Sequence, residues 1–220
     1  MSVVAIDGPA GAGKTTIAKA VADALRWDYV DTGAMYRALT LKALDEGVDL
    51  NDGDRLGRVA HGARVSSNGG TVLLDGDDVT TRVRSRAVTE AVPRVAAQPE
   101  VRQALVQLQR EAARSGDVVM EGRDIGSVVV PDAVLKIFLT ASLPERARRR
   151  LEEVGLDATE ENVARMENSI GERDSVNAGR ETSPLVQADD AIPIDTTDKT
   201  IDEIVSEIVG LLKERLNVRG

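Results

Sequence analysis

Segments of strand length alternate along the chain with stretches in which apolar residues recur every three or four positions. The strand-like segments lie at 3–6, 27–30, 117–121, 134–139 and 191–194. Helical spacing follows the first segment at Ile17, Val21 and Leu25, and it follows the last over 201–212. Strands that alternate with helices in this way predict an α/β fold built on a parallel sheet. A length of 220 residues predicts one domain with room for insertions.

One region departs from this pattern and predicts an antiparallel insertion. The chain is polar and glycine-rich from about 45 to 70, and the dipeptides Asn68-Gly69 and Asp75-Gly76 are hairpin signals. We therefore expect short strands near 63–67, 71–74 and 77–79, which would form a small meander.

Several residues mark the ends of the predicted helices. Thr32 is placed to cap a helix over 34–44, Pro99 to open another, and Thr200-x-x-Glu203 forms a capping box.

Two further helices, one over 145–150 and one from about Thr159, are separated by a polar loop and could form a hinged lid. The stretch that follows contains Asn177, Gly179 and Pro184, so we expect Arg173 and Arg180 to lie in a loop.

The first strand leads into a phosphate-binding motif. Residues 8–15 match G-x-x-x-x-G-K-[ST], and a helical pattern follows them, in the order that a P-loop requires. Its glycines let backbone N–H groups surround a phosphate, Lys14 would reach the β- and γ-phosphates, and the Thr15 hydroxyl would ligate Mg²⁺. The alternative is a glycine-rich turn that only joins strand to helix. The predicted nucleotide-binding residues are Gly8, Pro9, Ala10, Gly11, Ala12, Gly13, Lys14, Thr15 and Thr16.

The amino-acid composition limits the classes of molecule that the chain is expected to bind. A net charge of −9 argues against a nucleic-acid-binding surface and favours small substrates. The chain has no cysteine, which excludes disulfides, thiolate catalysis and Cys-ligated zinc, and its single histidine, His61, lies in a polar stretch and is expected at the surface. No apolar run approaches membrane-spanning length and no leader-like segment precedes the first strand. We expect a cytoplasmic protein that binds neither membranes nor nucleic acids.

Arginines are the candidate contacts for a phosphorylated substrate. Arg37 lies one strand–helix unit after the P-loop, and Arg123 and Asp124 follow a buried strand at its carboxyl end, where α/β sheets bind ligands. The planar guanidinium suits bidentate phosphate contacts. The alternative for Arg37, and for the arginines over 146–150, is a solvated surface charge.

Together with the P-loop, three further motifs carry a family resemblance. They are Asp31-Thr32-Gly33-Ala34-Met35-Tyr36-Arg37, Glu121-Gly122-Arg123-Asp124-Ile125-Gly126, and Arg173-Asp174 through Ser183-Pro184-Leu185. Over nearly its whole length the chain resembles the bacterial cytidylate kinases. The resemblance implies a three-layer α/β/α P-loop fold with a five-stranded parallel sheet, an inserted NMP-binding subdomain with a β meander, and a helical lid. It implies one domain, with the core at about 1–46, 96–145 and 173–220, the insertion at 47–95 and the lid at 146–172.

The same resemblance implies roles for individual residues. The phosphate of CMP or dCMP would be held by Arg37, Arg123 and Arg180, with Arg173 and Asn177 near the sugar and phosphate. Arg102 and Asp124 resemble a base-reading pair, and their chemistry complements cytosine, which offers an amino donor and ring acceptors. Thr32 and Tyr36 complete the predicted substrate contacts. Catalysis is assigned to Lys14, Arg123, Arg180 and an arginine of the lid, for which Arg148 is named.

The implied reaction is transfer of a phosphoryl group from ATP to CMP or dCMP with Mg²⁺, by a monomer. Two residues depart from the family pattern: Pro93 stands where a serine is usual, and Asn177 where an aspartate is usual. The preference for ribose or deoxyribose and the tolerance of UMP therefore stay open. A hydrolysing P-loop switch is a rival, although the chain has no N-K-x-D motif. The other rivals are a nucleotide-sensing module and a kinase for UMP, AMP or a non-nucleotide acceptor.

Overall fold

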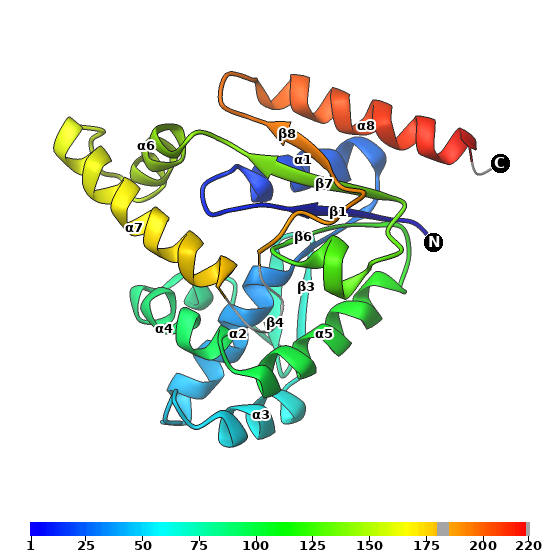
Figure 1. Cartoon of the computed structure of the whole chain (residues 1–220). Coiled ribbons are helices and arrows are strands. Elements are labelled where there is room, and N and C mark those ends of the chain that lie inside the picture. The colour runs from blue at the N-terminus through cyan, green and yellow to red at the C-terminus, as the bar shows by residue number, and fades with distance from the viewer. Residues whose placement is uncertain (180–184, 219–220) are drawn as a thin grey trace. The chain divides into compact units, whose positions relative to one another are not determined.

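The computed structural model describes residues 1–179 and 185–218 (Figure 1). The chain forms two compact units, which are described separately: unit 1 comprises residues 1–2 and 27–120, and unit 2 comprises residues 3–26 and 121–220. The finer division into core, insertion and lid stays a prediction.

The predicted α/β fold is confirmed. A five-stranded parallel sheet has the order β2 (Asp28–Asp31), β6 (Val118–Gly122), β1 (Val3–Asp7), β7 (Leu135–Thr140) and β8 (Ile192–Asp195). In unit 2, Ile6 of β1 lies opposite Ile137 of β7, and Ile137 lies opposite Ile192 of β8. Every residue of β1 is buried, as is usual for a strand inside a parallel sheet.

Helices α1 (Lys14–Leu25) and α8 (Ile201–Val218) pack together in unit 2, and α8 runs beside β8 (Figure 1). The predicted capping box opens α8: the backbone N–H of Thr200 donates to the Glu203 carboxylate at 2.8 Å, and the N–H of Glu203 donates to the Thr200 hydroxyl at 3.3 Å. These bonds satisfy two amides that a helix start leaves without partners.

The two expected helices of the lid region are α6 (Leu143–Glu153) and α7 (Glu160–Ala178). Thr159 caps α7, because its hydroxyl accepts from the Asn162 N–H at 3.3 Å. The expectation of a loop from Arg173 onward was wrong as far as residue 178. The glycine and proline that suggested a loop come late: Gly179 is the C-cap, and Pro184 lies outside the described residues. Arg173 and Asn177 therefore belong to a helix.

In unit 1, α2 (Thr32–Asp45) follows β2 directly. Its cap is Asp31, whose side chain accepts from the Ala34 N–H at 2.8 Å, so the expectation that Thr32 caps this helix was wrong. The helix begins two residues earlier than the apolar stripe suggested, at 32 instead of 34. Thr32 is instead the first helical residue, and it is buried.

The predicted meander is confirmed as a three-stranded antiparallel sheet of β3 (Val65–Asn68), β4 (Thr71–Leu74) and β5 (Asp77–Asp78). Unit 1 also contains α5 (Pro99–Ala113), which Pro99 opens as expected, and the short turn η1 (Arg82–Arg84). Two helices escaped the sequence analysis: α3 (Gly53–Gly62) and α4 (Arg86–Ala96). In α3 the polar background hides a stripe formed by Leu56 and Ala60, and α4 contains Pro93, a residue that argues against a helix.

Candidate active site

In unit 2, residues 8–13 of the motif form a loop between β1 and α1, and Lys14 and Thr15 begin α1. Gly8 has φ 150°, and a Cβ at this position would overlap the carbonyl oxygen of Leu139. Only glycine therefore fits here. The Lys14 side chain is buried, and its Nζ donates to the carbonyl oxygen of Pro9 at 2.8 Å. The ammonium is thus held against the loop, as a phosphate-binding lysine requires, and Thr15 and Thr16 are exposed on the first turn of α1.

Residues far away in the sequence support this loop. The Thr196 hydroxyl lies 3.3 Å from the carbonyl oxygen of Ala12, and Arg146 Nη1 donates to the carbonyl oxygen of Ala10 at 3.2 Å. The Ala10 N–H donates to the Asp174 carboxylate at 3.5 Å. The sequence motif gave no signal for Thr196 or Asp174, because each joins the loop from more than 160 residues away.

The arginines of α6, which lie in the predicted lid, have different surroundings. Arg146 is mostly buried and forms an ion pair with Asp174. Arg149 donates to the hydroxyl and carbonyl oxygens of Thr196 at 2.9 and 2.7 Å. Arg148, which the sequence analysis named, has a side chain that is 60% exposed and lies 3.9 Å from the Glu145 carboxylate. Among these three, Arg146 is the one whose guanidinium hydrogen-bonds to the P-loop backbone.

Gly122 is the last residue of β6, and Arg123 and Asp124, which follow it in unit 2, meet the start of the P-loop. Arg123 donates to the carbonyl oxygen of Gly8, and Asp124 is buried. Immediately after Asp124 the chain forms the single π-helical turn η2 (Ile125–Val129), a conformation that is rare and recurs at functional sites.

Asp7, the last residue of β1, holds that turn. Its carboxylate is buried and accepts the backbone N–H groups of Ile125 at 2.9 Å and Gly126 at 2.8 Å. The pKa of Asp7 is raised from 3.8 to about 6, mainly because burial disfavours the charged form. The nearby charge of Asp124 also raises it, whereas the two backbone hydrogen bonds and Lys14 lower it. The sequence analysis passed over Asp7 because it reads as the polar end of an apolar strand.

Unit 1 carries the other group of predicted substrate residues. Arg37 Nη1 on α2 donates to the Thr89 hydroxyl at 2.9 Å, and it lies 3.5 Å from the carbonyl oxygen of Val83. The guanidinium carbon of Arg102 on α5 lies 5.6 Å from the centre of the Tyr36 ring, within cation–π range. The structure thus brings Tyr36 and Arg102 together inside this unit. Arg102 is 4% exposed, far from the solvated charge that an arginine usually presents.

Arg180 lies outside the described residues, and only the backbone of Arg173 and Asn177 is described. Their proposed contacts stay predictions. In the described part of the chain, no group of three or more His, Cys, Asp or Glu residues could hold a metal ion, and no helix is long and apolar enough to cross a membrane.

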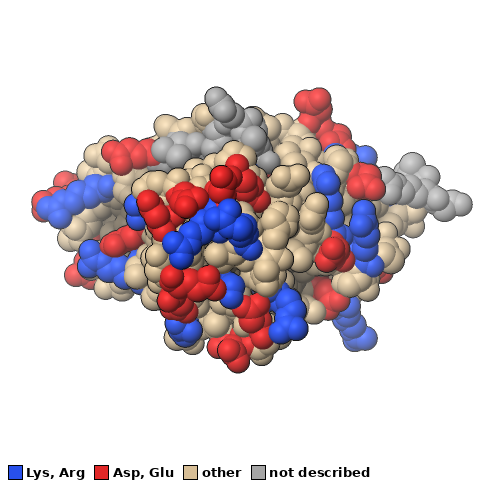
Figure 2. Space-filling view, turned by 90° about the horizontal axis from the view of Figure 1, so that it is seen from below, with Lys and Arg blue, Asp and Glu red and all other residues tan. Residues whose placement is uncertain are grey.

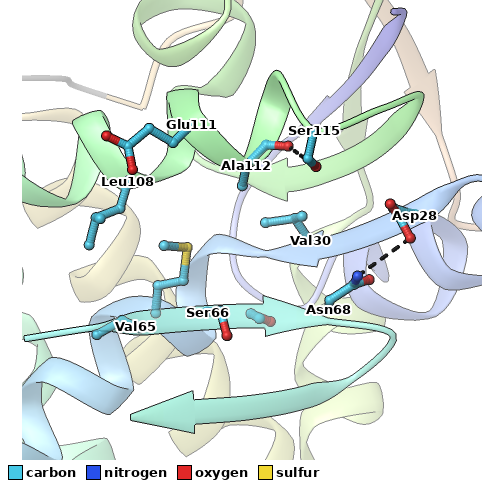
Figure 3. Close-up of a pocket in the computed structure, with 11 residues that line it drawn as sticks. Asp28, Val30, Val65, Ser66, Asn68, Leu108, Glu111, Ala112 and Ser115 are labelled. Carbon is cyan, nitrogen blue, oxygen red and sulfur yellow. Dashed lines mark hydrogen bonds between the residues drawn. The ribbon is translucent and has the colours of Figure 1, made fainter. Parts of the chain in front are cut away.

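A cavity of about 300 Å³ lies within unit 1, between β2, β3 and α5 (Figure 3). Asp28, at the first residue of β2, lines it, and its carboxylate accepts from Asn68 at 3.4 Å. Thr32 follows the opposite end of the same strand, and none of the predicted site residues lines the cavity. We therefore do not assign this cavity to the nucleotides.

Charged side chains are interspersed on the face of the molecule drawn in Figure 2, where Lys and Arg lie among Asp and Glu. His61 is exposed, as predicted.

Comparison with known proteins agrees with this geometry. The family model described as cytidylate kinase matches residues 4–214. A cytidylate kinase of Caldanaerobacter subterraneus subsp. tengcongensis is 49% identical over 99% of this chain and 96% of its own, and one of Pelotomaculum thermopropionicum is 51% identical over 94% and 93%. A solved gluconokinase of Sinorhizobium meliloti shares the fold, with a TM-score of 0.52, 16% identity, and coverage of 99% of this chain and 95% of that one. With a P-loop, a buried lysine and this breadth of similarity, the chain belongs to the cytidylate kinase family.

Proposed function

We propose that the chain transfers the γ-phosphoryl group of ATP to CMP or dCMP through the two groups of residues described above. Membership of the cytidylate kinase family carries the reaction: the chain is a (d)CMP kinase that uses ATP. A bond forms between an acceptor phosphate oxygen and the γ-phosphorus, and the bond from that phosphorus to the β,γ-bridging oxygen breaks. The products are CDP or dCDP and ADP.

The P-loop is the proposed donor site. Its backbone N–H groups and the start of α1 would hold the phosphates, and Lys14 would move from the Pro9 carbonyl oxygen to the transferring group, where negative charge is redistributed. Such transfer needs positioned positive charge and no nucleophile from the protein.

Mg²⁺ fits the donors that this loop offers. The ion takes few protein ligands and completes its shell with phosphate oxygens and water, and Thr15 presents an exposed hydroxyl on the first turn of α1. When bound, it would neutralise charge on the donor phosphates. The assignment of Thr15 as its ligand is part of this proposal.

For the acceptor, we assign Arg37, Arg123 and Arg180 to the phosphate. Arg37 already donates to an uncharged hydroxyl, Thr89, which a phosphate oxygen would readily replace because charge-assisted bonds are stronger. Arg102 and Asp124 would read the base. Thr32, Tyr36, Arg173 and Asn177 would complete the site, as the family resemblance implies.

Arg146 is the best candidate for the arginine of the lid. It already donates to the Ala10 carbonyl oxygen, whereas Arg148 points a largely exposed side chain toward Glu145. A lid of α6 and α7 that closes over the substrates would exclude water, which would otherwise accept the phosphoryl group.

Pro93 lies in α4 and offers no hydroxyl to a base, so recognition of cytosine would depend more heavily on Arg102 and Asp124.

We further propose that the chain acts as a cytoplasmic monomer.

The decisive experiment is ADP release at fixed ATP with a panel of acceptors: CMP, dCMP, UMP, AMP and none. The proposal expects release that depends on CMP or dCMP and is much weaker with the others. Release without an acceptor would instead identify a hydrolase, and a preference for UMP or AMP would overturn the assignment of the base.

A further inference from the structure

Asp7 joins the P-loop strand to the segment that carries Asp124. Both of its carboxylate oxygens are used: Oδ1 accepts from the N–H of Ile125 at 2.9 Å and Oδ2 from the N–H of Gly126 at 2.8 Å. Asp7 itself is only 6% exposed. A carboxylate that accepts two neighbouring amides fixes the path of the backbone directly after Asp124.

Arg123, the residue before Asp124, is bound to Gly8, the residue after Asp7. Arg123 donates to the carbonyl oxygen of Gly8, the first residue of the P-loop. The carbonyl oxygen of Asp124 also accepts from Val128 at 2.9 Å and Val129 at 3.1 Å, which closes the η2 turn. The residues on either side of Asp124 are thus attached to Asp7, the last residue of β1, and to Gly8, which follows it: Arg123 through its guanidinium group and Ile125 through its backbone N–H.

We propose that Asp7 is a positioning residue for base selection: by holding Ile125 and Gly126, it keeps the Asp124 carboxylate where it reads cytosine. This inference rests on the proposed role of Asp124 as a base-reading residue. Asp7 need not contact either nucleotide, because it acts through the backbone of the η2 turn. The bonds also tie the base-reading segment to the strand that enters the donor loop.

Charged residues of both the proposed base-reading segment and the P-loop act on Asp7. Asp124 and Lys14 act on it electrostatically, and Arg123 binds the adjacent Gly8. Burial raises the pKa of Asp7 to about 6, so the carboxylate is ionised near neutral pH and becomes protonated as the pH falls below that value. When Asp7 is protonated, one carboxyl oxygen carries a hydrogen that points toward a backbone N–H. Asp7 then loses one of its two hydrogen bonds to Ile125 and Gly126.

The test compares Asp7→Asn with the wild-type chain, and it measures kcat/KM for CMP and for UMP together with KM for ATP. The amide keeps one acceptor and turns its NH₂ toward a backbone N–H. We expect the CMP-to-UMP ratio of kcat/KM to fall by roughly tenfold, the cost of one misplaced base contact, while KM for ATP changes by less than about threefold. The P-loop keeps its own contacts from Thr196 and Arg146.

Asp195→Asn is the matched control, because Asp195 also ends a parallel strand and accepts a backbone N–H, that of Thr197 at 2.9 Å. Its CMP-to-UMP ratio should stay at the wild-type value. If Asp7→Asn leaves the ratio unchanged, or raises KM for CMP, UMP and ATP alike, the positioning role is wrong.

A second measurement needs no variant and covers the case in which Asp7→Asn does not fold. The CMP-to-UMP ratio of the wild-type chain should decrease between pH 7.5 and pH 5.5. The two substrates carry the same phosphate, which titrates near pH 6, so its ionisation cancels in the ratio. A ratio that is constant across this range overturns the inference.

Asp124→Asn separates this inference from the proposed function. If that variant changes the CMP-to-UMP ratio and Asp7→Asn does not, only the positioning role of Asp7 fails. If neither variant changes the ratio, the base-reading assignment of Asp124 fails first.

Discussion

Arg146 on α6 and Asp174 on α7 form an ion pair, and both residues contact Ala10 in the phosphate-binding loop. Arg146 donates to the Ala10 carbonyl oxygen, and Asp174 accepts from the Ala10 N–H. Two helices of unit 2 are thus fastened to the same residue of the loop through opposite charges. A triphosphate in the loop would attract Arg146 and repel Asp174, so the occupancy of the donor site should act on both helices.

Replacing Arg146 by alanine should reduce kcat/KM for ATP by roughly ten- to a hundredfold, since charge-assisted hydrogen bonds contribute about 1.5–3 kcal/mol each. Steady-state kinetics with varied ATP at saturating CMP would measure the loss. Arg150→Ala is the control, because Arg150 pairs with Glu153 on its own helix at 2.7 Å. A larger loss in Arg148→Ala than in Arg146→Ala would restore the assignment made from the sequence.

Lys14→Ala should lower kcat by roughly a hundred- to a thousandfold, because Lys14 is proposed to act on charge in the transition state. The melting temperature should change much less than the activity, since Lys14 is the first residue of α1 and its Nζ donates to a backbone carbonyl oxygen, that of Pro9. Lys19→Ala, on the same helix, serves as the comparison. Activity of Lys14→Ala within a few-fold of wild type would refute the proposed role.

Asp124→Asn should reduce the preference for CMP over UMP, mainly through a loss with CMP. Ionised aspartate only accepts hydrogen bonds and so suits the cytosine amino group, whereas an amide can also donate to the uracil carbonyl oxygen. A mismatched base-edge contact costs about 1–3 kcal/mol, so the change should be roughly ten- to a hundredfold in the ratio of kcat/KM. An unchanged ratio would show that Asp124 does not read the base.

Asp7 should also leave a signature in the pH dependence of stability. Its pKa is about 6 in the folded chain against 3.8 for the ordinary group, so between these values the folded state binds the proton more tightly than the unfolded state. The contribution of Asp7 to the free energy of unfolding is therefore fully present below pH 3.8 and is lost as the pH rises through about 6. The full effect is about 3 kcal/mol.

Urea unfolding of the wild-type chain and Asp7→Asn at several pH values from 4 to 7 would measure this effect. The difference in unfolding free energy, wild type minus variant, should decrease as the pH rises and level off above 6. Because carboxylates such as Asp75 and Asp190, whose pKa values are lowered by their partners, are present in both proteins, their contribution cancels. A difference that does not vary with pH would contradict the burial of an ionised Asp7.

The sequence by itself determined the features that depend on neighbouring residues. The P-loop is a contiguous motif, so its glycines, Lys14 and Thr15 could be identified from their order alone. The capping box at Thr200 and Glu203 and the turn at Asp75-Gly76 are equally local, and both are present in the structure. The turn that Asn68-Gly69 indicated lies one residue later, at Gly69-Gly70, because Asn68 pairs with Thr71 at the end of β3. Strand and helix order followed from hydrophobic periodicity, because burial on one face imposes a spacing on the chain.

Local rules misjudged several helices. The few apolar residues of α3 are Leu56, Val59 and Ala60, in a polar sequence, and Pro93 argued against α4, yet packing in unit 1 stabilises both. Gly179 suggested a loop but only ends α7.

Tertiary structure alone decided which residues surround the loop. Asp7 meets Ile125 and Gly126 across 118 and 119 positions, Asp174 meets Ala10 across 164, and Thr196 meets Ala12 across 184. No local pattern specifies such pairs. Those of Asp7 and Thr196 depend on parallel strands that bring distant segments to the same edge of a sheet, and that of Asp174 depends on the packing of α7 against α6. The same reason explains why the sequence could not single out one of the arginines over 146–150. Their chemistry is the same, and only the tertiary structure places Arg146 within hydrogen-bonding distance of Ala10.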